Sequence, residues 1–172
     1  MSAAAAERTD SADRHPNLGL APADMTAGFP AAAAAVRRNS PKIAARALEA
    51  AVEADPSFRT RYDETGLRRL LHDVEVMNER LALCLGSGST RWLTEYAEWI
   101  GPILRRRGVP QADMAALCAG VIAEIKTKAD PDELAAATRA LDAAAAVFKR
   151  NGRLGGDRHK RNALLKWMYR GV

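Results

Sequence analysis

The sequence has few of the features that membrane proteins and disulfide-rich proteins need. Its 172 residues include two cysteines, too few for a disulfide framework. No apolar run approaches the roughly 20 residues that a transmembrane helix requires, and the N-terminus has no apolar stretch typical of a secretory signal. We therefore expect a cytoplasmic protein and consider membrane association unlikely.

Residues that favour strands are scarce as well. Val, Ile and Thr together number 21 and aromatic residues make up 5%, whereas alanine alone numbers 36. Alanine loses no side-chain entropy in a helix, while strands favour β-branched and aromatic side chains. The composition therefore predicts an all-α fold, and the sequence has no alternating apolar and polar segments typical of strands.

Helix start and stop signals divide the chain into three parts. Residues 1–30 mix prolines with polar residues and are predicted to form a disordered leader. Residues 31–150 are predicted to form an antiparallel bundle of four to six helices, and residues 151–172 a basic amphipathic helical tail. The main helices are expected near residues 40–54, 64–85, 90–107, 110–128 and 131–150, with proline or a capping residue at their starts and glycine at several ends.

The expected helix 64–85 has two apolar stripes. One consists of Leu67, Leu70, Leu71, Val74, Leu81 and Leu85, and the second, nearly opposite, of His72, Val76 and Leu83. A helix that is apolar on two sides is either packed between neighbours or faces the core on one side and a partner on the other. The second stripe is therefore a candidate surface for a homo-oligomer.

A small-ligand pocket is conceivable at His72, Trp92, Tyr96 and Trp99. His72 is the only histidine expected inside the core, where it could bind a haem-like iron or act as a proton switch; a structural histidine is the favoured interpretation. The three aromatic residues follow helical core spacing, which favours core packing over a wall for a flat ligand. Pro102 removes one backbone hydrogen bond from the same helix and could kink it beside Trp99.

No motif or cluster of residues indicates catalysis, so we expect a protein that is not an enzyme and has no cofactor or metal site. Cys84 and Cys118 lie on different expected helices without metal-site spacing and are predicted to be core residues. Asp130, Asp132 and Glu133 are typical of a helix start. Arg105, Arg106 and Arg107 suit the negative end of a helix dipole.

Positive charge is concentrated at the C-terminal end. Residues 149–172 contain eight basic residues and one acid, a net charge of +7, while the other 148 residues contain 18 basic and 20 acidic residues, a net charge of −2. The candidate contact residues of the tail are Arg158, Lys160, Arg161, Leu164, Leu165, Lys166, Trp167, Met168, Tyr169 and Arg170. Such a segment can dock in a protein groove, bind phosphates or lie on an anionic membrane. Alternatively, it folds back as the last core helix.

Residues 67–110 combine a helix that contains an aspartate, a glycine break, and a Tyr-Ala-x-Trp helix that ends in Arg-Gly-Val-Pro. The residues concerned are Asp73, Leu81, Leu85, Gly86, Tyr96, Ala97, Trp99, Arg107, Gly108, Val109 and Pro110. In these features the segment, about a quarter of the chain, resembles a helical module of bacterial signalling and cobalamin-binding regulatory proteins. The resemblance implies a sensory or protein-interaction module. The segment has no cobalamin-ligand signature, so no cobalamin is implied.

The sequence therefore predicts a regulatory or adaptor protein that contacts a protein partner through its basic C-terminal tail. One alternative is a nucleic-acid-associated protein that uses the tail as an electrostatic arm, with binding that weakens steeply as salt rises. Another is a small-ligand or tetrapyrrole sensor that uses the aromatic helix. The identity of the partner and the oligomeric state are left open.

Overall fold

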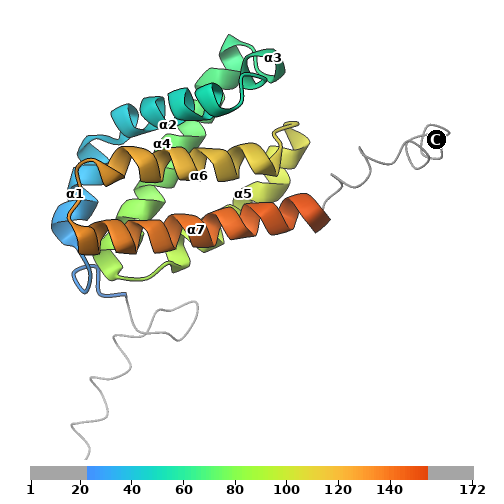
Figure 1. The fold of residues 1–172 in the computed structure, drawn as a ribbon. Coiled ribbons are helices and arrows are strands. Elements are labelled where there is room, and N and C mark those ends of the chain that lie inside the picture. Colours follow the sequence, from blue (N-terminus) through green and yellow to red (C-terminus); the bar gives the residue numbers. More distant parts are fainter. Residues whose placement is uncertain (1–22, 155–172) are drawn as a thin grey trace, which may run out of the picture.

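Every regular element of the computed structural model, which describes residues 23–154, is a helix, so the all-α prediction is confirmed. The helices are α1 (Pro30–Arg38), α2 (Ser40–Ala54), α3 (Phe58–Arg61), α4 (Glu64–Ser87), α5 (Arg91–Arg106), α6 (Gln111–Lys126) and α7 (Pro131–Leu154) (Figure 1). The described part has more helices than expected because α1 and the four-residue α3 both form. None of these helices is long and apolar enough to cross a membrane.

The helix α4 lies at the centre of the packing, in contact with α1, α2, α5 and α7. It begins at the N-cap Asp63, whose Oδ1 accepts a hydrogen bond from the Gly66 amide at 2.7 Å. It ends at Gly88, which adopts the left-handed conformation with φ 70°. Its buried face includes Leu70, Val74, Leu81 and Leu85 from the first predicted apolar stripe, while Leu67 and Leu71 are half-buried.

The backbones of α2 and α6 touch where the two helices cross. A Cβ atom on Gly120 would lie 2.6 Å from the carbonyl oxygen of Ala47 and 2.8 Å from its Cα. Real Cβ atoms essentially never come closer than 3.0 Å to another heavy atom, so only glycine fits without a shift of the helices. The small residues of these alanine-rich helices thus set how closely α6 approaches α2.

The end of the predicted leader is attached to α4. The amides of Gly28 and Phe29 donate to the carbonyl oxygens of Gly86 and Leu85, at 2.9 and 2.6 Å. Carbonyls in the last turn of a helix lack intrahelical donors, and these two backbone bonds supply them. Residues 1–22, the rest of the predicted leader, lie outside the described residues.

Three helix ends differ from the predictions. The helix α4, expected to end at residue 85, continues to Ser87. Ser40, at the start of the expected helix 40–54, does not cap α2 but is its first residue; it is buried, and its hydroxyl and carbonyl oxygens both accept from Asn78 Nδ2 at 3.2 Å. The helix α7 was expected to end near Arg150, but it continues through Gly152 to Leu154. A glycine ends a helix when it turns left-handed, and among the described glycines only Gly88 and Gly108 have positive φ.

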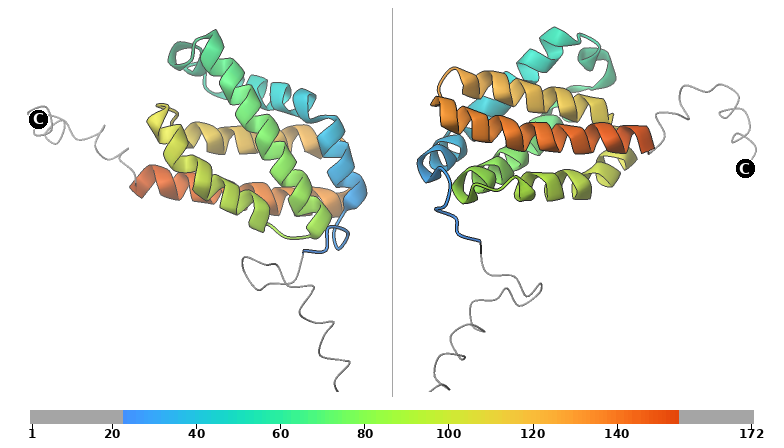
Figure 2. Two further views of the ribbon diagram at one scale, coloured as in Figure 1. Left: turned by 180° about the vertical axis from the view of Figure 1, so that it is seen from behind. Right: turned by 60° about the horizontal axis from the view of Figure 1, so that its bottom comes forward.

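The helices α6 and α7 lie side by side and run in opposite directions (Figure 1). The helices α4 and α5 form the face seen from behind (Figure 2, left). This arrangement leaves one long side of α5 at the molecular surface.

Candidate interaction surfaces

The four residues predicted to line a ligand pocket lie in different environments. Tyr96 is buried, and Trp92 is half-buried, with its indole nitrogen 3.2 Å from the hydroxyl oxygen of Ser87, to which it donates. Trp99 is 64% exposed, and His72 is exposed as well. None of the three hollows described below has any of these four side chains in its lining. The sequence placed three of them on one helix but did not distinguish core from surface, and none of these hollows brings the four together.

The placement of His72 inside the core is wrong. The buried face of α4 passes through Leu70, Val74 and Met77, and His72 lies two residues after Leu70, about 200° around the helix. On the same side, Val76 is only half-buried. The second predicted stripe of α4 therefore lies toward the surface, and α4 faces the core mainly through its first stripe.

One long side of α5 forms a partly apolar surface, here called the outer stripe. Its members share the side of the helix centred on Trp99: Trp92, Glu95, Trp99, Pro102, Ile103 and Arg106. The opposite side of α5 contains the fully buried Leu93 and Leu104. Trp92 and Ile103 pack partly against the core, whereas Trp99 is the exposed large hydrophobic side chain of residues 23–154. Large exposed apolar side chains at the centre of such surfaces are typical of protein contacts.

The end of α5 is fixed to α4 by a largely desolvated ion pair. Arg107 Nη1 lies 3.1 Å from Asp73 Oδ1, and Nη2 lies 3.0 Å from Oδ2. The Asp73 side chain is 9% exposed and that of Arg107 29%, so this pair is better shielded than an ordinary surface ion pair. From the sequence, we predicted a role for Arg107 at the helix dipole but no ion pair. The signal that was missed is Asp73, an acidic residue on the mostly apolar buried face of α4.

The neighbouring Tyr96 is an uncharged aromatic side chain. Burial raises the pKa of its phenol, and the negative charge of Asp73 raises it further. Its ring lies against that of Trp99, with centroids 6.2 Å apart and planes tilted by 41°. Tyr96 therefore supports the exposed indole from below as a neutral aromatic side chain.

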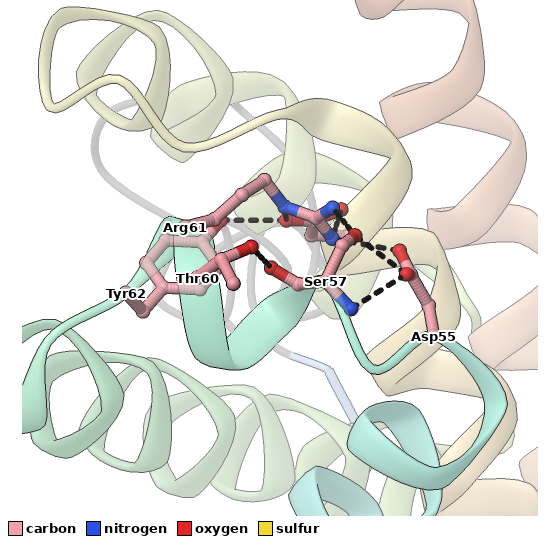
Figure 3. A network of polar contacts seen from close by, with 6 residues as sticks. Asp55, Ser57, Thr60, Arg61 and Tyr62 are labelled. Atoms are coloured by element: carbon pink, nitrogen blue, oxygen red, sulfur yellow. Dashed lines mark hydrogen bonds and ion pairs between the residues drawn. The ribbon is translucent and has the colours of Figure 1, made fainter.

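A second polar network ties α3 to the start of α6 (Figure 3). Arg61 donates through Nε and Nη2 to the two carboxylate oxygens of buried Asp113, at 3.2 and 3.1 Å, and Tyr62 donates to Asp113 Oδ2 at 2.6 Å. Arg61 also bonds Asp55, at 2.9 Å, and lies over the Phe58 ring, 4.7 Å from its centroid. Burial raises the pKa of Tyr62, and the hydrogen bond to Asp113 raises it further. These groups are all engaged in holding helices together.

The two cysteines are free and buried, as the sequence predicted. Burial raises the pKa of the Cys84 thiol to about 11 and that of Cys118 to about 12. The reactive thiolate is therefore scarce at neutral pH. Residues 23–154 contain no group of three or more His, Cys, Asp or Glu side chains that could hold a metal ion.

An open groove of about 320 Å³ lies between α2, α3 and α4. Its apolar lining comes mainly from Leu48, Val52, Leu67 and Leu71, and its polar lining comes from Glu49, Glu53 and Arg59. The same two glutamates border a second, more polar hollow of about 220 Å³ between α2 and α6. A smaller cavity of about 90 Å³ lies among α1, α2, α6 and α7 and is lined mostly by alanine and branched aliphatic side chains.

The predicted contact residues of the tail, 158–170, lie outside the described residues. The structure does fix the place where the tail leaves the body. Arg150 forms an ion pair with Glu98 of α5 at 3.0 Å, and Arg105 of α5 donates to the Asn151 carbonyl at 3.5 Å. The last turns of α7 are thus attached to α5.

Comparison of the chain with protein-family models, with curated proteins and with solved structures gives no match. The resemblance of residues 67–110 to a regulatory helical module stays a prediction.

Proposed function

We propose that this protein is a regulatory or adaptor protein of a bacterial cytoplasm, in which residues 31–150 form a helical bundle and the basic tail contacts a protein partner. The observation that carries the proposal is the separation of charge: residues 149–172 have a net charge of +7, whereas the preceding 148 residues have −2. A near-neutral helical body with one basic amphipathic end is typical of a scaffold that presents a docking segment.

The contacts of the body support this division of roles. Two ion pairs with buried carboxylates, Arg61–Asp113 and Arg107–Asp73, each join two helices. Ion pairs that are shielded from water and hold packed elements together contribute to one defined body. The tail leaves the body from α7, which packs along α5. The cytoplasmic location is supported by the two free, buried cysteines.

The tail joins an apolar set and a basic set of side chains, and variants can separate them. The first variant replaces Leu164 and Met168 by glutamate, which removes the apolar face. The second replaces Lys160, Arg161 and Lys166 by glutamine, which removes charge and keeps the apolar face. A chain that ends at Leu154 serves as the tail-free reference, because α7 extends to that residue and keeps its contact with α5 at Asn151.

The test uses these proteins as baits for cross-linking in a cell extract and then measures the affinity of the purified partner by calorimetry. We expect one partner that binds the full chain, is lost with the Leu164→Glu and Met168→Glu variant, and survives in the glutamine variant with a reduced association rate. A partner that binds the chain ending at Leu154 equally well would contradict the assignment of the tail as the contact.

The nucleic-acid alternative is favoured by the same excess of charge and needs its own measurement. Labelled duplex DNA and single-stranded RNA are titrated with the full chain and with the tail-free chain at low and moderate salt. The five basic residues within 158–170 predict, if all contact phosphates, a log–log salt slope of roughly −4. Binding with such a slope that needs the tail, and that the glutamine variant loses, would replace the adaptor function by this one.

A further inference from the structure

We propose that the protein forms a homodimer in which the outer stripe of α5 packs against the outer stripe of a second copy. The two helices run antiparallel, with the two-fold axis near Trp99. The proposal is independent of the function assigned to the tail, because every residue that carries it belongs to the described body.

The centre of this surface is Trp99. It is 64% exposed, although a tryptophan side chain has a large apolar area that water disfavours. The apolar side chains of Trp92, Pro102 and Ile103 extend the surface along the same side of α5. Tryptophan is among the residues that contribute most when they are buried at the centre of a protein interface.

The outer stripe extends along most of α5. Counted from Trp92, the members follow at i+3, i+7, i+10, i+11 and i+14, positions that lie on one side of an α-helix over four turns. Within residues 23–154 no other helix covers Trp99, so this side of α5 is accessible to a second copy.

The charges along α5 select a second copy in antiparallel orientation. Glu95 lies four residues before Trp99 and Arg106 seven after it, so a two-fold axis level with residues 100–101, next to Trp99, brings Glu95 of one copy toward Arg106 of the other, twice. Glu95 has only an exposed pair with Arg91, with side chains 52% and 47% exposed, and such pairs are weak. Among the described residues, Arg106 has no ion-pair partner. A surface that pairs with itself in this way is what a two-fold dimer requires.

The outer stripe is also attached to the body on both sides of Trp99. Tyr96 lies in the core beneath Trp99, and Arg107, at the end of α5, pairs with buried Asp73. A surface that is already ordered loses little conformational entropy when it binds. The second copy therefore meets a preformed, self-complementary surface.

The experiment measures the mass of the full-length protein by sedimentation equilibrium over a wide concentration range. We expect a monomer–dimer equilibrium for the wild type, a dimer dissociation constant at least about thirtyfold higher for Trp99→Ala, and only monomer for Trp99→Glu. Far-ultraviolet circular dichroism spectra, and melting curves recorded at a concentration where the wild type is monomeric, show whether the variants stay folded; because Trp99 is exposed, both should keep the wild-type values there. A wild type that stays monomeric, or a dimer that persists in Trp99→Glu, would overturn the proposal.

Charge reversal tests the antiparallel orientation. Glu95→Arg and Arg106→Glu should each weaken the homodimer, because each brings like charges together. A mixture of the two variants should form a heterodimer, since both contacts then become Arg–Glu pairs. Glu64→Arg is the matched control, because Glu64 has an exposed pair with Arg68 on α4 at the same i,i+4 spacing but lies away from α5; it should leave the dimer unchanged. Failure of the two variants to associate with each other would exclude this orientation.

Discussion

At Gly120, where α2 and α6 cross, the effect of a Gly120→Ala substitution on stability depends on two opposing energies, helix propensity and backbone overlap. In Gly120→Ala, the added methyl group favours the helix by about 1 kcal/mol, because glycine is the poorer helix former. The same methyl would lie 2.6 Å from the Ala47 carbonyl oxygen, about 0.8 Å short of the 3.4 Å of ordinary contact. The obstructing atoms belong to the backbone, so a rotamer change cannot make room, and the helices must separate.

Separation by this amount weakens the packing along the whole crossing. A gap of 0.5–1 Å already removes about a quarter to a half of the dispersion attraction between facing atoms, and overpacked cores lose about 1–3 kcal/mol or more. With an overpacking cost at the upper end of that range and a gain in helix propensity of about 1 kcal/mol, we expect a net loss of about 2 kcal/mol. In urea, this corresponds to a midpoint lower by roughly 1 M.

Gly101→Ala is the comparison, because the atoms nearest its added methyl are the ends of flexible side chains, Asn151 Nδ2 at 2.7 Å and Gln111 Oε1 at 3.4 Å. These can rotate, so the midpoint should fall much less. Urea unfolding followed by circular dichroism at 222 nm measures both variants. An unchanged or higher midpoint for Gly120→Ala would refute the claim that backbone contact sets the distance between α2 and α6.

Three further predictions concern polar and thiol groups. Asp113→Asn leaves Arg61 without its buried carboxylate partner and should lower the free energy of unfolding by about 1–3 kcal/mol, measured by the same urea titration. Cys84 and Cys118 should react slowly with a thiol reagent at pH 7.5 in the native state and rapidly in denaturant, because burial raises both pKa values; fast native labelling would contradict their burial. Hydrogen bonds from Ser57 and, to a lesser extent, from Arg61 lower the pKa of Asp55. The contribution of Asp55 to stability is therefore present above its unfolded pKa and is lost as pH falls through the lower folded pKa. On acidification, the melting temperature of Asp55→Asn should fall less than that of the wild type.

Helices were predictable from this sequence because their signals are local. Asp63 caps α4 as its position before the apolar stripe indicates, and Gly108 ends α5 with positive φ. The end of α4 was harder, since two glycines lie two residues apart. Gly88 makes the left-handed turn, while Gly86 stays helical next to the carbonyl of Met25. That choice depends on a contact with a distant segment, which local sequence does not record.

The functional surface was less predictable than the fold. Spacing placed Trp92, Tyr96 and Trp99 on one helix but could not show that the core lies toward Tyr96 and that Trp99 faces outward. The pairing of Asp73 with Arg107 was missed for a similar reason: the two residues belong to different helices, and only the packing of α4 against α5 brings them within 3.1 Å. Periodicity gives the sides of a helix, and the neighbouring helices decide which side is covered.

The attachment of α7 to α5 has a consequence for valency. Arg150 is bound to Glu98, one residue before Trp99, so a two-fold axis near Trp99 relates two tail exit points that are each anchored on the dimer helix. A partner with two matching sites would then meet both tails at once. For such a partner, the second contact becomes intramolecular, with an effective concentration in the millimolar range for short connections, and the combined affinity can exceed that of one tail by about 10²–10⁴. A dimer of weak single contacts would in this way act as a tight bivalent ligand, and loss of the Trp99 contact would reduce tail binding without any change in the tail itself.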